Sequence, residues 1–278
     1  SVYTGPSLVV KADAATYSES FWNTNRHDTL TKAESKVYSN IDSLEKMPSF
    51  RRTMAVVTLL VAGYTALGPV DMGPAATFYS FNPVEGFRLR LGGRTTPKLS
   101  KRIYFEGYGA YGFKDERWKY YGGVTYSLNN QSIYAFPMHF VRASYQKETK
   151  IPGQDLEFVS EDNILLSLKR GLNDKWTYNK YFRIDYVHEL PSRLSYTIGF
   201  RNWKHEAAGG LIYQTVKNGQ TVVVPEVNTS EITGQIRWAP KEQFFQGKVY
   251  RVSMVNKYPI LTLNLTAGLK GVMGSNYK

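Results

Sequence analysis

The segment Asn82-Pro-Val-Glu-Gly86, which precedes Arg88 and Arg90, is the local motif most suggestive of chemistry. Glu85 and the two arginines could form a polar cluster inside a β-barrel, the fold that the strand pattern described below predicts. There the cluster would bind a substrate or hold a plug segment in place. Alternatively, the segment makes a turn, and the arginines are inward-facing strand positions that pair with Glu106 and other acids. Arginines buried in a membrane protein need partners in any case, so we favour this structural interpretation.

Other residue types with catalytic or ligand-binding potential are poorly spaced. The histidines, too far apart along the chain to predict a metal site, are His27, His139, His188 and His205. The glycines within 107–112 belong to a strand pattern with no helix after it, so a phosphate-binding loop is not predicted. No catalytic Ser/His/acid triad can be recognised in the sequence, and the absence of cysteine excludes thiol catalysis. We therefore expect no catalytic residue, no cofactor, no metal ion and no enzymatic activity.

The charged residues lie in segments where apolar and polar side chains alternate, which predicts β-strands. Such alternation runs through residues 86–93, 101–113, 118–128, 194–201 and 261–269, among others. The longer segments have about 9–13 residues, the length that a tilted strand needs to cross a bilayer, whereas strands average about 5–6 residues. We predict that the polar side faces a barrel lumen, and its charged candidates are Glu85, Arg88, Arg90, Glu106, Lys119, Arg183, Asp185, Arg201 and Arg237.

The first fifty residues follow a different pattern. Thr31 and Glu34 are spaced as a capping box, which predicts the start of a helix. Apolar residues then recur on one helical face, at Val37, Ile41, Leu44 and Met47. Because Pro48 cannot continue the helix, we expect one amphipathic helix over about 32–47. The predicted organisation is a periplasmic segment over 1–52, followed by the strands of an antiparallel transmembrane β-barrel over 53–278.

Composition fits a membrane barrel but does not require one. The longest apolar stretch is too short for a membrane helix. Aromatic residues make up 14% of the chain, with 21 tyrosines, and tyrosine and tryptophan gather at the rims of membrane barrels. The net charge of +12 raises the question of nucleic acid, but the basic residues are scattered, so no nucleic-acid partner is predicted. Lipid headgroups, lipopolysaccharide phosphates or acidic partners would balance this charge equally well. A soluble β-sandwich would also alternate, and remains an alternative.

The stretch from Tyr79 to Thr95 carries the most distinctive motif, Tyr-Ser-Phe-Asn-Pro-Val-Glu-Gly-Phe-Arg-Leu-Arg-Leu-Gly-Gly-Arg-Thr. Further characteristic segments are Phe21–His27, Glu106–Gly112, Lys114–Glu116, Ser160–Leu165, Lys257–Leu261 and Gly271–Gly274. Together they resemble the outer-membrane proteins of Bacteroidota usually labelled carboxypeptidase-like regulatory domain-containing, whose main body is a domain of unknown function. The resemblance covers nearly the whole chain.

This resemblance implies an N-terminal β-sandwich regulatory module, a periplasmic region and a barrel similar to the surface-antigen and barrel-assembly superfamily. We expect the chain to be a fragment that lacks the regulatory module and the last strands, so the barrel would be incomplete. The implied protein resides in the bacterial outer membrane, among its lipid and lipopolysaccharide, and joins other envelope proteins in a complex. Its expected role is in envelope protein assembly or export. An anion-preferring pore or solute receptor and a soluble β-sandwich binding module are the alternatives.

Overall fold

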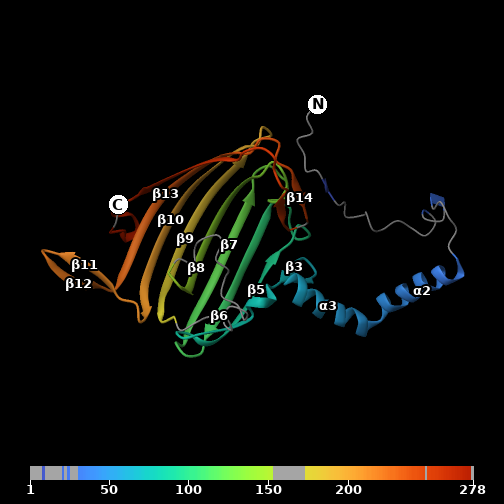
Figure 1. Cartoon of the computed structure of the whole chain (residues 1–278), viewed down its shortest axis with the longest axis horizontal. Helices are drawn as coiled ribbons and strands as arrows, with labels where there is room; N and C mark the ends of the chain where they lie inside the picture. Colours follow the sequence, from blue (N-terminus) through green and yellow to red (C-terminus); the bar gives the residue numbers. More distant parts are fainter. Residues whose placement is uncertain are drawn as a thin grey trace.

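The computed structural model describes residues 8–9, 21, 24–25, 31–152, 173–247 and 249–276. Two predicted features, His27 and the segment Ser160–Leu165, lie outside these residues. Within them, the dominant element is one large antiparallel sheet with two helices beside it (Figure 1). The prediction of a mainly β, antiparallel chain is thus confirmed.

The large sheet has 11 strands, in the order β16-β13-β10-β9-β8-β7-β6-β5-β3-β2, with β4 paired to β5. Its strands are β2 (Thr65–Leu67), β3 (Val70–Met72), β4 (Tyr79–Asn82), β5 (Gly86–Thr95), β6 (Ile103–Gly112), β7 (Arg117–Ser127), β8 (His139–Lys150), β9 (Lys175–Glu189), β10 (Leu194–Gly209), β13 (Glu226–Trp238) and β16 (Leu261–Gly268). In the described part of the chain the sheet is open, because β16 pairs only with β13 and β2 only with β3. A closed barrel is not found, so the transmembrane barrel stays a prediction.

The central strands are long. β7 and β8 have 11 and 12 residues, β9 and β10 have 15 and 16, and β13 has 13. Each is about twice the average strand of a globular protein, or more. At about 3.3 Å per residue, even the shortest of them is over 30 Å long, which matches the hydrocarbon thickness of a bilayer.

Two helices precede the sheet. α2 (Lys32–Lys46) begins with the predicted capping box, in which the Thr31 N–H donates to Glu34 Oε2 at 2.8 Å and the Glu34 N–H donates to Thr31 Oγ1 at 3.3 Å. Pro48 ends this helix but starts another, α3 (Pro48–Ala62), so the strands begin at Thr65 instead of residue 53. Proline suits the first turn of a helix because the N–H that it lacks would have no partner there. Neither helix in the described segments is long and apolar enough to cross a membrane.

Smaller elements accompany the large sheet. β11 (Tyr213–Lys217) and β12 (Gln220–Val224) form a hairpin that projects from the ends of β10 and β13 (Figure 1). Its turn residues Asn218 and Gly219 both have positive φ, as this tight turn requires. A separate sheet joins β14 (Phe244–Gln246), β15 (Arg251–Ser253) and, in parallel, β1 (Leu8–Val9). Two 3-10 turns are η1 (Ala75–Thr77) and η2 (Val272–Gly274).

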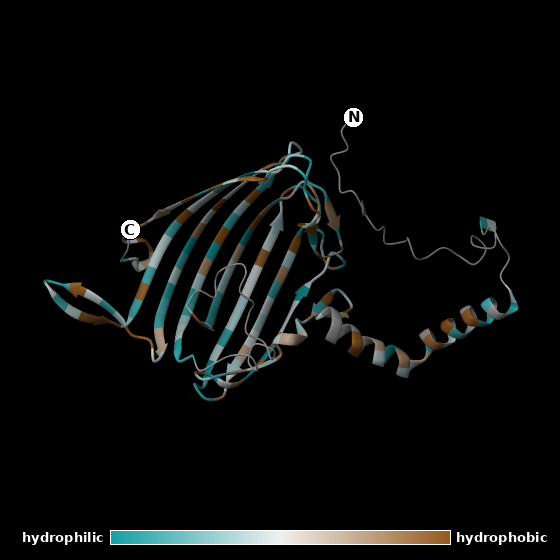
Figure 2. Ribbon diagram, in the orientation of Figure 1, coloured by the Kyte–Doolittle hydropathy of each residue, from teal (hydrophilic) through white to brown (hydrophobic). Residues whose placement is uncertain are grey.

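The large sheet is curved, which gives it two different faces. Tyr121 of β7 and Asn264 of β16 line one cavity although four strands separate them, so their face is concave. The opposite, convex face carries exposed apolar side chains along β5, β6, β7, β10, β13 and β16. Figure 2 shows brown and teal segments alternating along several of the long strands, as this division of the faces requires.

Burial follows the same division, with the usual polarity reversed. Among the described residues, buried polar and charged side chains outnumber buried apolar ones. The apolar core is a small cluster of Tyr104, Ile133 and Phe140. The sheet therefore turns charge inward and leaves hydrocarbon outward.

Candidate functional site

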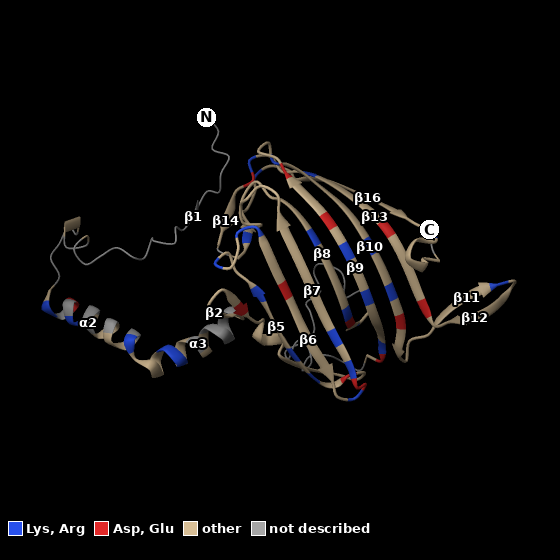
Figure 3. Cartoon of the chain, turned by 180° about the vertical axis from the view of Figure 1, so that it is seen from behind, with Lys and Arg blue, Asp and Glu red and all other residues tan. Residues whose placement is uncertain are grey.

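The charged side chains of the concave face form two networks, one at each end of the sheet, with a polar groove between them. Figure 3 shows the acidic and basic residues distributed along the strands. We name the networks after their most buried carboxylates. The Glu85 network lies where β6 turns into β7, and the Glu242 network lies where β9 turns into β10.

The Glu85 network consists of five charged side chains from β5, β7, β8 and two turns. Lys119 Nζ lies 2.7 Å from Glu85 Oε1 and 2.6 Å from Asp115 Oδ2. Arg88 Nη2 donates to Glu148 Oε2 at 2.7 Å, and Arg88 Nη1 lies 3.7 Å from Glu85 Oε2. Glu85 and Lys119 are almost completely buried. The network thus ties β5 to β8 across two intervening strands.

The turn between β4 and β5 positions Glu85. Asn82 Oδ1 accepts from the N–H groups of Val84 and Glu85, at 3.1 and 2.8 Å, and Asn82 Nδ2 donates to Glu85 Oε2 at 2.6 Å. Such an asparagine turn substitutes side-chain for backbone hydrogen bonds. Gly86 follows with φ of 66°, and a Cβ there would lie 2.8 Å from the Lys114 Cβ. The predicted turn is therefore present, and it also aims the carboxylate.

Neighbouring side chains extend the Glu85 network along the concave face. The Tyr108 hydroxyl donates to Glu148, and Gln146 Nε2 donates to the Tyr108 hydroxyl at 3.0 Å. The Arg90 guanidinium stacks 3.6 Å above the centre of the Tyr108 ring. Gly112 leaves the space that the network needs, because a Cβ there would lie 2.8 Å from Lys119 Nζ.

Burial dominates the electrostatics of Glu85. The network contains three acids and two bases, so its carboxylates are not fully balanced. Burial raises the pKa of the Glu85 carboxyl above its ordinary value, and the positive charge of Arg88 only partly offsets this effect.

The Glu242 network joins the opposite ends of the strands. Arg237 donates two hydrogen bonds to Glu242, at 2.8 and 2.7 Å, and Arg251 donates two to Glu189, at 2.8 and 3.1 Å. Burial alone would raise the pKa of Glu242, but the hydrogen bonds and charge of Arg237 outweigh it and hold the pKa below its ordinary value. Bidentate pairs of this kind are the strong form of charge-assisted hydrogen bond.

Aromatic rings pack against the arginines of this end. The Arg251 guanidinium stacks 3.9 Å from the centre of the Phe244 ring, and Arg193 stacks 3.9 Å from Phe136. These contacts fasten the hairpin β14–β15 and the loop before β8 over the end of the sheet. The result is a cap built from loops far apart in sequence.

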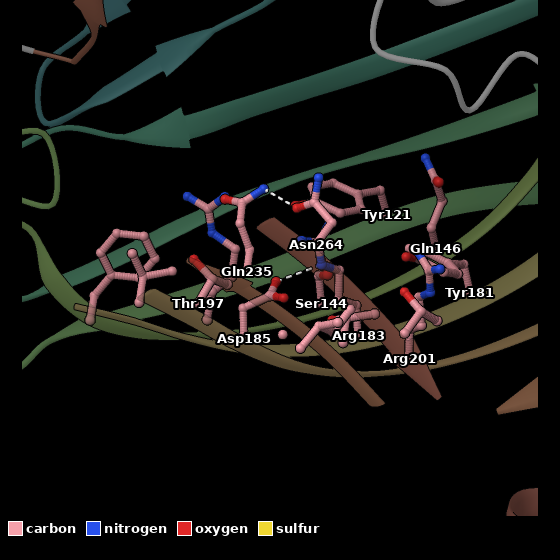
Figure 4. Close-up of a pocket in the computed structure, with 17 residues that line it drawn as sticks. Tyr121, Ser144, Gln146, Tyr181, Arg183, Asp185, Thr197, Arg201, Gln235 and Asn264 are labelled. Atoms are coloured by element: carbon pink, nitrogen blue, oxygen red, sulfur yellow. Dashed lines mark hydrogen bonds and ion pairs between the residues drawn. The ribbon is translucent and has the colours of Figure 1, made fainter. Parts of the chain in front are cut away.

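Between the networks lies a groove of about 570 Å³. Figure 4 shows its polar side chains, which come from β7, β8, β9, β10, β13 and β16. Arg183 and Arg201 face each other in register on β9 and β10. Each has its own acid: Arg183 Nε lies 2.6 Å from Asp185 Oδ2, and Arg201 Nε donates to Glu231 Oε2 at 2.6 Å. Gln235 Nε2 donates to Asn264 Oδ1 at 2.8 Å across β13 and β16.

The nine charged candidates from the sequence separate into these regions. The Glu85 network brings together Glu85, Arg88 and Lys119, whereas Arg237 belongs to the Glu242 network. The groove contains Arg183, Asp185 and Arg201. Arg90 and Glu106 line a smaller cavity with Tyr108.

The expected pairing with acids is confirmed for Arg88, but Glu106, the partner named for Arg88 and Arg90, was wrong. Sheet register places Glu106 opposite Arg94, and its carboxylate accepts from the Tyr121 hydroxyl at 2.7 Å. Arg88 instead reaches Glu148, which lies 60 residues away in sequence.

Four acidic residues of the concave face were not predicted from the sequence, namely Asp115, Glu148, Glu231 and Glu242. Strand alternation could have identified Glu148 and Glu231, because they share a parity with Gln146 and Thr233. Nothing local indicates that Glu242 turns back onto Arg237 from the segment after β13.

Among the residues that the structure describes, the concave face shows no arrangement typical of catalysis. In the described residues no three His, Asp or Glu side chains lie close enough together to hold a metal ion. His139 and His188 lie on the convex face, where their rings stack with centres 4.1 Å apart and each contacts a tyrosine hydroxyl. What the face does provide is a groove lined by charged and polar side chains.

Comparison with known proteins gives a family and no activity. No curated protein matches the chain, and no solved structure matches it. One family model matches residues 69–278, which contain the whole sheet from β3 onward. Its description is the C-terminal domain of a family of unknown function, DUF5686. The kinship with carboxypeptidase-like regulatory proteins of Bacteroidota stays a prediction. Because the match covers well over half of its length, this chain belongs to the DUF5686 family and contains its C-terminal domain.

Proposed function

We propose that this protein is an integral outer-membrane β-sheet protein whose convex face contacts lipid, and that it serves in the assembly or export of envelope proteins. The observation that carries the membrane part is the reversed polarity of the sheet. Leu91, Trp118 and Leu265 of the convex face each expose more than 60% of their surface, whereas Glu85 and Lys119 are almost completely buried.

The hydrophobic effect favours lipid over water on the convex face. Burying one such side chain contributes roughly 1.5–3 kcal/mol, and the face carries more than ten of them. Soluble monomers rarely leave a continuous apolar surface of this extent uncovered. Lipid tails would remove this surface from water without any further protein.

Aromatic residues at both ends of the strands support the same orientation. Near the β6–β7 turn, the Tyr111 ring contacts the rings of both Phe113 and Trp118. At the other end of the sheet, Tyr186 and Tyr196 cluster with the stacked histidines. Tyrosine and tryptophan favour the interface between hydrocarbon and headgroups, with aliphatic residues between the two belts.

The membrane part is tested by fractionation. We expect the protein to sediment with membranes and to resist alkaline carbonate washing, and to enter solution only with detergent. Release into the aqueous fraction without detergent would contradict it and would favour the soluble binding module.

The open edges support a role in assembly or export. The outer backbone groups of β16 have no strand beside them in the described sheet. In lipid, each unpaired N–H or C=O costs several kcal/mol, so an edge of this kind must pair with another strand. A strand of a client protein would satisfy the edge during transit.

Photocrosslinking tests this role. A photoreactive residue at Thr262, on edge strand β16, should form adducts with nascent barrel proteins, and one at Phe81 of β4 tests the other edge. A matched residue at Ile198, inside the sheet on β10, should form none. Adducts absent from both edges would contradict the assembly role.

A second candidate function is an anion-preferring pore. The groove favours it, because Arg142, Arg183 and Arg201 outnumber the nearby acids Asp185 and Glu231. Basic linings favour anions. Planar-bilayer recordings should then show an anion-selective conductance, and the absence of any channel would exclude the pore.

A further inference from the structure

The convex face carries a row of three lysines that cross-strand register places side by side. Lys147 of β8 lies opposite Lys180 of β9, which in turn lies opposite Lys204 of β10. Like charges at directly opposed positions destabilise a sheet unless an anion lies between them. We name these three residues the lysine row.

Within the part of the chain that the structure describes, carboxylates pair with only two of the three lysines. Lys180 Nζ lies 3.2 Å from Glu206 Oε1, and Lys204 Nζ lies 2.6 Å from Glu226 Oε1. Both glutamates lie between the lysine row and the nearer ends of β10 and β13. Among the described residues, no carboxylate lies within ion-pair distance of Lys147. One ammonium group of the row is therefore left for an external anion.

An apolar hollow adjoins the lysine row on the same face. Its volume is about 410 Å³, and its lining includes Phe105, Val124, Ala143, Tyr145 and Phe182. Gly122 forms its floor, because a Cβ added there would meet no atom within 4 Å.

Register fixes how close the hollow and the row are. Gly122 lies opposite Tyr145, and the next pair on the same face joins Tyr120 with Lys147. Two residues along a strand correspond to about 7 Å. The rings of Tyr120 and Tyr145 lie 5.9 Å apart and form the border between the two features.

We propose that the hollow and the lysine row together form a binding site for an anionic phospholipid. The phosphate lies at Lys147 and Lys180, and one acyl chain lies over Gly122 between the walls formed by Phe105 and Tyr145. Charge complementarity selects the headgroup, and the apolar hollow selects the chain. This inference rests on the proposed lipid contact of the convex face and adds a specific lipid class and position to it.

Native mass spectrometry of the detergent-purified protein tests the site, with phosphatidylglycerol and phosphatidylcholine as probes. The unmodified protein should retain phosphatidylglycerol in preference to phosphatidylcholine. The double variant Lys147→Gln/Lys180→Gln should lose roughly tenfold in phosphatidylglycerol affinity, because two ammonium groups no longer attract the phosphate. Gly122→Leu should weaken retention of both lipids, since its side chain fills the hollow.

Two control variants match these changes. Lys217→Gln removes an exposed lysine of the hairpin β11–β12, and Gly109→Leu adds a side chain at a convex-face glycine that also has open space but lies outside the hollow. Both should bind lipid like the unmodified protein. Unchanged binding in the lysine variant, or equal loss in the controls, would overturn the site.

A spin-label measurement shows whether a negative result contradicts only the phospholipid site or also the proposed lipid contact of the convex face. A nitroxide at Ile198→Cys, on the convex face away from the hollow, reports lipid contact on its own. If this label lies in lipid while the lysine and glycine variants bind normally, only the phospholipid site is wrong. If the label is in water, both proposals are wrong.

Discussion

The two faces of the large sheet are built from the same strands, yet one exposes apolar side chains and the other buries charged ones. On β13, Ile236 is exposed on the convex face, whereas its neighbour Gln235 lines the concave groove. On β5, Leu91 is exposed, whereas Arg88 is buried with two carboxylates. Alternation by one residue therefore separates a hydrocarbon surface from an ionic interior. At these positions strand parity, rather than strand identity, decides whether a side chain is exposed on the convex face or lies among polar groups.

The largest loss of stability is expected when an arginine of the Glu85 network is removed. Arg88→Met leaves Glu148 and Glu85 without their guanidinium partner, and a buried unpaired charge costs about 3–5 kcal/mol. As the matched control, Arg201→Met removes an arginine whose ion pair with Glu231 is partly exposed, and should cost about 1 kcal/mol or less. Denaturant unfolding in detergent measures both. Equal losses would show that the Glu85 network contributes no more than an exposed pair.

The next effect compares the faces at adjacent positions. Ile236→Arg places a charge on the lipid side and should destabilise the protein by about 2–4 kcal/mol in bilayers. Gln235→Arg places the same side chain in the polar groove and should change stability by less than about 1 kcal/mol. Unfolding in lipid vesicles gives the two values. A tolerated arginine at position 236 would contradict the division of the faces.

The smallest expected effect is a difference in pH dependence between the two networks of the concave face. Glu242 has a lowered pKa, so its contribution is present above the ordinary carboxyl value of 4.5 and is lost as the pH falls. Glu85 has a raised pKa, so its contribution is present at low pH and is lost as the pH rises above the ordinary value. Each change should amount to about 1 kcal/mol.

Unfolding of Glu242→Gln and Glu85→Gln across a pH series measures these opposite slopes relative to the unmodified protein. The stability advantage over Glu242→Gln should shrink toward acid pH, and that over Glu85→Gln should shrink toward alkaline pH. Slopes of the same sign would show that the two networks do not differ in the way described.

The local features of the fold could be predicted from the sequence. The alternating segment 118–128 corresponds to β7 (Arg117–Ser127), and the capping box marks the start of α2. In contrast, α3 was missed, because the apolar run from Met54 to Ala62 suits a strand or a helix equally well. Periodicity finds elements whose two sides differ, and it fails where they do not.

The partners within the site could not be predicted in the same way. Alternation placed Arg88 on the polar face, but its partner Glu148 depends on the curvature of the sheet between β5 and β8. Arg237 finds Glu242 through the turn after β13, which no periodic pattern covers. Pairings of this kind depend on register and curvature, which a single sequence does not contain.

The central claim is that the convex face contacts lipid tails. Nitroxide labels at Leu263→Cys and Asn264→Cys, adjacent residues on opposite faces of β16, test it most directly in native envelopes. The label at position 263 should be relaxed by oxygen and shielded from a water-soluble nickel reagent, and the label at 264 should show the reverse. A label at 263 that is accessible to nickel and poorly accessible to oxygen would contradict the claim.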